Sequence, residues 1–91
     1  MSPLVRIPTI LRPYASGAAE VEVEGGTLRE VLDDLDRRCP GISARVLDEE
    51  GQLRRFVNVY VDDDDVRFLE GLQSPVPQHA KVSIIPAVAG G

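Results

Sequence analysis

The segment TLREVLDDLDRRCPG, which begins at Thr27, predicts a single amphipathic helix near the middle of the chain. Thr27 and Glu30 have the spacing of a capping box, in which the two side chains bond backbone N–H groups left unpaired at a helix start. Apolar residues then recur every three or four positions, at Leu28, Val31, Leu32 and Leu35. Pro40-Gly41 ends the pattern. A helix with one apolar stripe must bury that stripe against a second layer, which the rest of the chain has to supply.

Short β-type segments on both sides of this helix are the candidates for that layer. Residues 3–11 (PLVRIPTIL) and 19–26 (AEVEVEGG) precede the helix and are joined by a turn-rich loop, which predicts a hairpin. Residues 56–61 (FVNVYV) follow it, with three valines at alternate positions and therefore on one face. Residues 81–86 (KVSIIP) form the last predicted strand, whose inward residues are Val82 and Ile84.

The intervening segments carry weaker signals. Residues 42–47 predict a short helical turn, the four aspartates at 62–65 predict a turn, and residues 66–68 allow one additional short strand. This order of elements predicts an α+β, β-grasp domain, in which a mixed sheet of four to five strands packs on one main helix. Residues 1–86 are predicted to form the domain, and residues 87–91 a flexible C-terminal tail that ends in Gly-Gly.

Charge and cysteine content exclude several classes of protein. The 91 residues include 10 basic and 15 acidic side chains, and the net charge of −5 argues against nucleic-acid binding, which requires a basic surface. The sequence has no apolar run of about 20 residues to span a membrane and no signal-peptide pattern, so we expect a cytoplasmic protein. Cys39 is the only cysteine, which excludes an intramolecular disulfide, a cysteine-rich zinc site and a four-cysteine iron–sulfur cluster.

The C-terminal sequence IIPAVAGG is the strongest candidate for a functional segment. After Pro86 no side chain offers an acid, a base, a thiol, an amide or a hydroxyl. Glycines lack a Cβ, so an enzyme's backbone and a nucleotide could close around them, and five residues reach about 17 Å when extended. The reactive group would then be the α-carboxylate of Gly91, which becomes a good electrophile only as a mixed anhydride such as an acyl-adenylate. A frayed chain end is the alternative interpretation.

Three other features are weaker candidates for a site. An EF-hand loop beginning at Asp62 would need glycine and glutamate where the sequence has arginine and glutamine, so Asp62–Asp65 is interpreted as a solvated turn or an acidic docking patch. His79 has no serine or cysteine pattern that would make a catalytic triad. Cys39 stands at the end of the helix, where the helix dipole raises the pKa of a thiol. We therefore predict no catalytic residue and no metal site.

A partner-binding face is predicted from the alternation of the later strands. Phe56, Tyr60 and Ile85 should lie on the sheet face opposite the three valines. If the helix covers only one face of the sheet, these side chains form an exposed apolar patch, and such patches often mark protein interfaces. The alternative is that loops cover them.

Three stretches of sequence carry a resemblance to a known family. IPTILRP near the start, RFVNVYVDDDDVRF in the middle and PAVAGG at the end resemble the ThiS/MoaD family of ubiquitin-like sulfur carrier proteins, across essentially the whole chain. Within that family the sequence is most similar to the actinobacterial carriers used in cysteine biosynthesis. The resemblance implies that Gly91 is the site of adenylation and thiocarboxylate formation. It also implies that a short segment is threaded into the partner enzymes, namely Ala87, Val88, Ala89 and Gly90.

The resemblance further implies a set of partners. An E1-like enzyme would adenylate the carrier with ATP, and sulfide would replace AMP to give the thiocarboxylate. A PLP-dependent cysteine synthase would direct that sulfur to an aminoacrylate formed from O-phosphoserine, and a zinc metallopeptidase would release cysteine. ATP and PLP would belong to these enzymes, so the chain itself is predicted to bind no cofactor and to be a carried reagent, not an enzyme.

Two alternatives to this interpretation stay open from the sequence. The same carrier chemistry could serve thiamin, molybdopterin or thiosugar synthesis, or conjugation to protein lysines, because the reactive group is identical. The chain could also be a ubiquitin-like interaction module whose tail is never activated.

Overall fold

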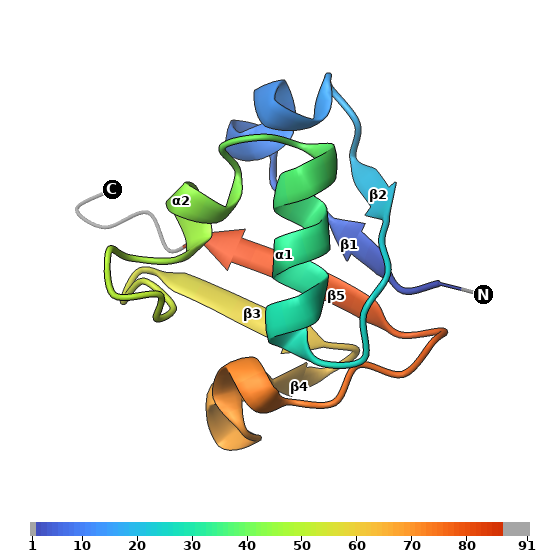
Figure 1. The fold of residues 1–91 in the computed structure, drawn as a ribbon, viewed down its shortest axis with the longest axis vertical. Coiled ribbons are helices and arrows are strands. Elements are labelled where there is room, and N and C mark those ends of the chain that lie inside the picture. The colour runs from blue at the N-terminus through green and yellow to red at the C-terminus, as the bar shows by residue number, and fades with distance from the viewer. Residues whose placement is uncertain (1, 87–91) are drawn as a thin grey trace.

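The computed structural model describes residues 2–86, which form a mixed sheet with helices on one side (Figure 1). The strands are β1 (Leu4–Arg6), β2 (Glu20–Glu22), β3 (Val57–Val61), β4 (Asp64–Asp65) and β5 (Lys81–Pro86). Their order in the sheet is β2-β1-β5-β3-β4, and only β1 and β5 run parallel. The helices are α1 (Leu28–Arg38) and α2 (Ser43–Val46), with three 3-10 turns, η1 (Thr9–Ala15), η2 (Val66–Phe68) and η3 (Gly71–Gln73).

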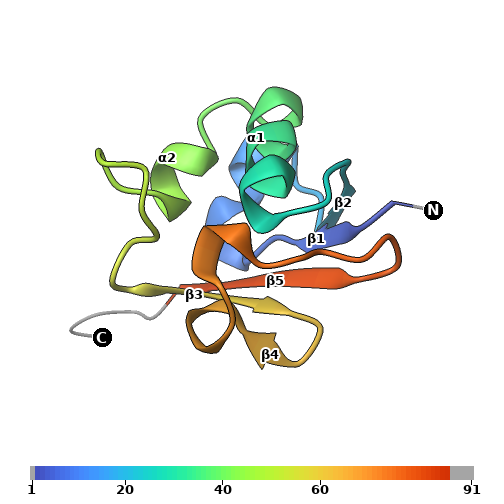
Figure 2. The same ribbon diagram turned by 60° about the horizontal axis from the view of Figure 1, so that its bottom comes forward.

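The predicted α+β, β-grasp arrangement is confirmed. Figure 2 shows α1 and α2 on the same side of β3 and β5. The apolar stripe of α1 has no solvent exposure and meets the inward side chains of the strands. Those inward side chains are the ones predicted from alternation, Val57, Val59, Val61, Val82 and Ile84. One continuous core therefore lies between the two layers.

The start of α1 is capped almost as predicted. The Thr27 hydroxyl accepts a hydrogen bond from the Glu30 N–H at 3.3 Å. The Glu30 carboxylate accepts from the N–H of Gly26 at 2.8 Å, one residue earlier than the reciprocal bond of a standard capping box. The two bonds still satisfy backbone donors at the helix start, and they fix the turn that leads from β2 into α1.

Two predictions of local structure are wrong. The first strand ends at Arg6, because the chain turns at Pro8 and residues 9–15 form η1, which buries Leu11 and Ala15 against the core. Residues 66–68 form η2 instead of an additional strand, because the Asp65 side chain accepts from the Arg67 N–H and caps a 3-10 turn. The extra strand is β4, formed by the last two aspartates of the acidic run.

The last strand is central in the sheet. β5 pairs with β1 on one side and with β3 on the other. It is the longest strand that the structure describes, and its C-terminal residue, Pro86, pairs with Val57 at the start of β3. Residue 86 is therefore anchored by the most fully paired strand of the sheet. The prediction of a separate flexible tail at 87–91 falls outside the described residues.

Candidate functional site at the end of β5

The predicted reactive group lies one short segment beyond the described part of β5. Gly91 and Gly90, with Ala89, Val88 and Ala87, lie outside the described residues, so their roles stay predictions. The structure does define the surroundings of Pro86, from which that segment follows. Ile84 points into the core and is 3% exposed, whereas Ile85 points to the opposite face and is 48% exposed.

The predicted apolar face exists on the side of the sheet away from α1. Ile85 pairs directly with Asn58 on β3, and Tyr60 lies two residues further along that strand. Phe56 precedes the strand and is 55% exposed, and Tyr60 is half-buried. Ile85 and Tyr60 thus share one face, and loops do not cover them completely. Phe56 lies in the turn before β3, so strand alternation does not place it, and it is exposed there. Partner binding through this face stays a prediction.

Arg67 also contributes to this face. Its guanidinium donates to the Asn58 side-chain oxygen and to the backbone carbonyls of Val57 and Arg54, the latter two at 2.9 Å each. These bonds attach η2 to the start of β3. The apolar face therefore has a fixed cationic group beside Asn58, which the sequence pattern did not predict.

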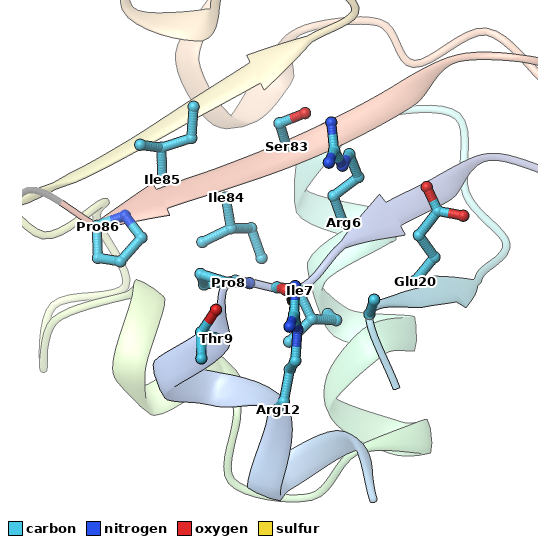
Figure 3. A pocket seen from close by; sticks show the side chains of 11 residues that line it. Arg6, Ile7, Pro8, Thr9, Arg12, Glu20, Ser83, Ile84, Ile85 and Pro86 are labelled. Atoms are coloured by element: carbon cyan, nitrogen blue, oxygen red, sulfur yellow. Dashed lines mark hydrogen bonds between the residues drawn. The ribbon is translucent and has the colours of Figure 1, made fainter. Parts of the chain in front are cut away.

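A groove of about 510 Å³ borders Pro86 on the β1 side (Figure 3). It is lined by the apolar residues Pro8, Ile84, Ile85 and Pro86, by the two cations Arg6 and Arg12, and by the carboxylate of Glu20. The Arg12 Nε donates to the backbone carbonyl of Ile7 at 3.1 Å, which fixes the Arg12 side chain against the segment that joins β1 to η1. Arg6 is exposed and lies on the same outward face as Ser83 and Ile85.

A second groove, of about 360 Å³, borders Pro86 on the β3 side. It is lined by Phe56 and by three more arginines, Arg45, Arg54 and Arg55. The Arg45 Nε donates to the Tyr14 hydroxyl at 2.7 Å, and its guanidinium lies 5.6 Å from the centroid of that ring. Arg54 donates twice to the carbonyl of Ala44, at 3.0 and 3.1 Å. The end of β5 is thus bordered by cations on both sides.

The remaining predicted candidates lie away from this end of the sheet. Asp62 and Asp63 form the turn between β3 and β4, and His79 lies exposed in the turn before β5. Burial raises the pKa of the Cys39 thiol, so the predicted direction is confirmed but desolvation is the main cause. Among residues 2–86, no three His, Cys, Asp or Glu side chains are grouped so that they could hold a metal. No helix in the same range is long and apolar enough to cross a membrane.

The arginines around Pro86 are the residues that sequence reasoning missed. They come from β1, η1, α2 and the loop before β3, and only Arg54 and Arg55 are adjacent in the sequence. The Arg54-Arg55 pair was the sole linear signal, and it did not indicate that the other three would join it. Phe68, which is 88% exposed in η2, was likewise not predicted.

A mixed five-stranded sheet packed on one main helix defines a ubiquitin-like β-grasp protein. The sequence matches the ThiS family over residues 5–91, and the chain belongs to that family. The predicted family is therefore confirmed.

Individual relatives agree with this assignment. The sulfur carrier protein CysO of Mycobacterium tuberculosis (strain ATCC 25618 / H37Rv) is 48% identical over 93 residues, and the alignment covers all of both chains. The crystal structure of an Amycolatopsis orientalis BexX/CysO complex contains a chain that is 49% identical with a TM-score of 0.93, covering 99% of this chain and 100% of that one. The crystal structure of Mycobacterium tuberculosis CysO is 46% identical with a TM-score of 0.92, covering 96% of this chain and 100% of the other.

Proposed function

We propose that this chain is a sulfur carrier protein whose reactive group is the main-chain carboxylate of Gly91. The observation that carries the proposal is the full-length similarity to CysO of Mycobacterium tuberculosis, at 48% identity. The central position of β5 supports it, because a fully paired strand holds Pro86 firmly while the residues that follow reach into an enzyme. Five extended residues span about 17 Å, enough for a buried active site.

The chemistry requires activation of a weak electrophile. One carboxylate oxygen of Gly91 attacks the α-phosphorus of ATP, and pyrophosphate leaves. A sulfide nucleophile then attacks the acyl carbon of the adenylate, and AMP leaves with the carboxylate oxygen. The product is a thiocarboxylate, in which one oxygen has been replaced by sulfur. An E1-like partner supplies ATP and the active site, so the chain is the substrate of that enzyme and not itself a catalyst.

We propose cysteine biosynthesis as the destination of the sulfur. The thiocarboxylate attacks the β-carbon of an aminoacrylate that a PLP-dependent cysteine synthase forms from O-phosphoserine with loss of phosphate. The resulting thioester rearranges to an amide, and a zinc metallopeptidase hydrolyses that amide to release cysteine and restore the carboxylate. Supply to thiamin, molybdopterin or thiosugar synthesis, or conjugation to lysine, would use the same first product and a different acceptor.

Intact mass spectrometry tests the carrier role. The chain is incubated with the activating enzyme from the same organism, ATP and a sulfide source, and we expect the mass gain of one oxygen replaced by sulfur. Adding one residue after Gly91 should abolish this gain while leaving the melting temperature unchanged, because the carboxylate moves out of reach without altering the fold. Normal charging of the extended variant would overturn the mechanism. Incubation of the charged protein with O-phosphoserine and cysteine synthase then tests the destination.

A second candidate function is a ubiquitin-like binding module that is never activated. The exposure of Phe56 and Ile85, at 55% and 48%, favours it, because an apolar face of this kind can bind a partner without any chemistry at Gly91. The solved complex of a related CysO with BexX shows that one such relative is found bound to a protein. Binding that survives removal of Gly91, without any charging of the wild-type protein, would favour the module.

A further inference from the structure

The basic side chains of the molecule fall into two groups. One group forms ion pairs with carboxylates: Arg29 with Asp33, Arg37 and Arg38 with Asp34, and Lys81 with Glu20. The other arginines have no carboxylate of residues 2–86 within 4.0 Å. These are Arg6, Arg12, Arg45, Arg54, Arg55 and Arg67.

Five of these six arginines surround the end of β5. We call Arg6, Arg12, Arg45, Arg54 and Arg55 the arginine collar. Pro86 lines both grooves, so the collar has two arginines on its β1 side and three on its β3 side. Figure 3 shows Arg6 and Arg12 on the two sides of the first groove, with Ile85 and Pro86 at its end.

Neutral groups hold three of the five collar arginines in place. Arg12 and Arg54 donate to backbone carbonyls, and Arg45 donates to a tyrosine hydroxyl. Two carboxylates also line the grooves. Glu20 is the cross-strand neighbour of Arg6 but forms its ion pair with Lys81, at 3.4 Å, and Asp48 accepts from the backbone N–H groups of its own turn. A collar positioned in this way can still accept carboxylates in bidentate geometry.

The location of the collar limits what can cover it. The chain continues beyond Pro86, so a protein that encloses the following residues must place the rim of its entrance over the collar. A neutral or basic rim would remove water from several guanidinium groups without supplying a counter-charge, which is costly. An acidic rim would instead replace the lost hydration with charge-assisted hydrogen bonds.

The charge distribution of the whole molecule favours the same partner. The net charge is −5, so a surface of nucleic-acid phosphates would be repelled by most of the molecule. The acidic residues Asp62–Asp65 follow the end of β3 that pairs with Val82, opposite the end that pairs with Pro86. The molecule is therefore positive around Pro86 and strongly negative at the far end of the sheet, which would orient it toward an acidic entrance.

We propose that the arginine collar is the docking surface for an acidic rim on the activating enzyme that receives the C-terminal residues. The collar would guide the chain into the entrance with Gly91 first, and its role would end at binding, because no collar residue needs to touch the reacting carboxylate. This inference rests on the proposed carrier function, since it assigns the surface by which the carrier meets its enzyme.

The experiment compares two double variants that lose the same charge. Arg6→Gln/Arg55→Gln removes one collar arginine from each groove, and neither side chain makes a hydrogen bond to another of residues 2–86. Arg29→Gln/Arg37→Gln removes two arginines that are paired with carboxylates on α1. Both are assayed for thiocarboxylate formation with the native activating enzyme, ATP and sulfide. We expect the collar variant to lower kcat/KM at least about tenfold at low ionic strength, mostly through KM, and the control to change it little.

Salt gives an independent readout. The difference between wild type and the collar variant should shrink as ionic strength rises from about 0.01 M to 1 M, because the screening length falls from about 30 Å to 3 Å. Arg55→Glu, with a melting temperature checked against wild type, should exaggerate the effect. Equal kcat/KM for the collar and control variants would overturn the proposal. The proposal would also be overturned if the collar variant formed the thiocarboxylate faster than wild type, since this would mean that the collar holds the chain's own C-terminal carboxylate.

Failure of the underlying function gives a different result. If the wild-type protein forms no thiocarboxylate at all, the proposed carrier function is wrong, and the collar cannot be a docking surface for an activating enzyme. If wild type is charged and only the collar prediction fails, the carrier function stands. Binding of a fluorescent mixed-sequence single-stranded oligonucleotide by wild type, lost in the collar variant, would identify a nucleic-acid partner and overturn the acidic-rim assignment.

Discussion

Gly25 holds the backbone conformation that brings β2 to the start of α1. Its φ is +145°, and a Cβ at this position would lie 2.8 Å from the Val31 backbone nitrogen. That atom belongs to the helix and cannot move away without disturbing the first turn. Gly25 is therefore required both by its torsion angle and by close packing, whereas the neighbouring Gly26 has 3.6 Å to its nearest atom, the tip of the Glu30 side chain.

Gly25→Ala should lower the free energy of unfolding by about 1–3 kcal/mol, the usual cost of a strained backbone position. Gly26→Ala is the matched control and should cost much less, because its Cβ has room. Urea denaturation monitored by circular dichroism measures both. Equal stability of the two variants would contradict the packing argument.

Asp34 links the middle of α1 to the segment that follows β2. Its carboxylate accepts from the backbone N–H of Glu24 at 2.9 Å and from Arg38 Nε at 2.6 Å, and it also pairs with Arg37. The Arg38 hydrogen bond, the Glu24 N–H and the Arg37 hydrogen bond hold the pKa of Asp34 well below its usual range. The ionised carboxylate is thus bound more tightly in the folded protein than the neutral acid.

The interactions of Asp34 should make the stability of the fold depend on pH. A lowered folded-state pKa contributes stability that is fully present above the ordinary aspartate pKa of 3.8, and that is lost as the pH falls toward the folded-state value. Asp34→Asn should therefore lower the melting temperature at pH 7, and its difference from wild type should narrow below about pH 4. Calorimetry across pH 2–7, with Asp33→Asn as the control because Asp33 makes only an exposed pair at 3.8 Å with Arg29, tests this. A pH-independent difference would show that the carboxylate charge is not responsible.

Elements formed by interactions between residues close in the sequence were predicted well, and those formed by contacts between distant residues were not. The helix α1 was predicted correctly because its cap, its apolar stripe and its Pro40-Gly41 stop are all local. The turn η1 was missed because its apolar residues are too few to show a period, and it forms where Leu11 and Ala15 find the core. The alternation in β3 and β5 predicted the exposed face, but not the side chain of Arg67 across it. Nothing local brings together the arginine collar, whose members meet only when the sheet and helices are assembled.

The whole molecule presents two surfaces that could act together or alone. One is the apolar face formed by Tyr60 and Ile85, with Phe56 exposed just before β3. The other is the end of β5, bordered by the arginine collar, from which the residues up to Gly91 follow. A carrier needs both surfaces, because a partner enzyme must bind it and must also react with its terminal carboxylate. The carboxylate alone offers the enzyme little to recognise, so binding energy from the apolar face is needed to position it. A binding module needs only the face.

Ile85→Glu separates these possibilities when it is compared with deletion of Gly91. Ile85 is 48% exposed, so a charged side chain there should leave the melting temperature nearly unchanged. It would place a carboxylate in the apolar face and beside the collar arginines Arg6 and Arg12. We expect affinity for the activating enzyme to fall at least about tenfold, which corresponds to losing about 1.4 kcal/mol at the interface. Deletion of Gly91 should weaken binding less and abolish charging completely. Isothermal titration calorimetry and intact mass on the same samples measure the two effects. If Ile85→Glu bound and charged like wild type, the enzyme would have to recognise the carrier through some other surface, and the apolar face of β3 and β5 would need another explanation.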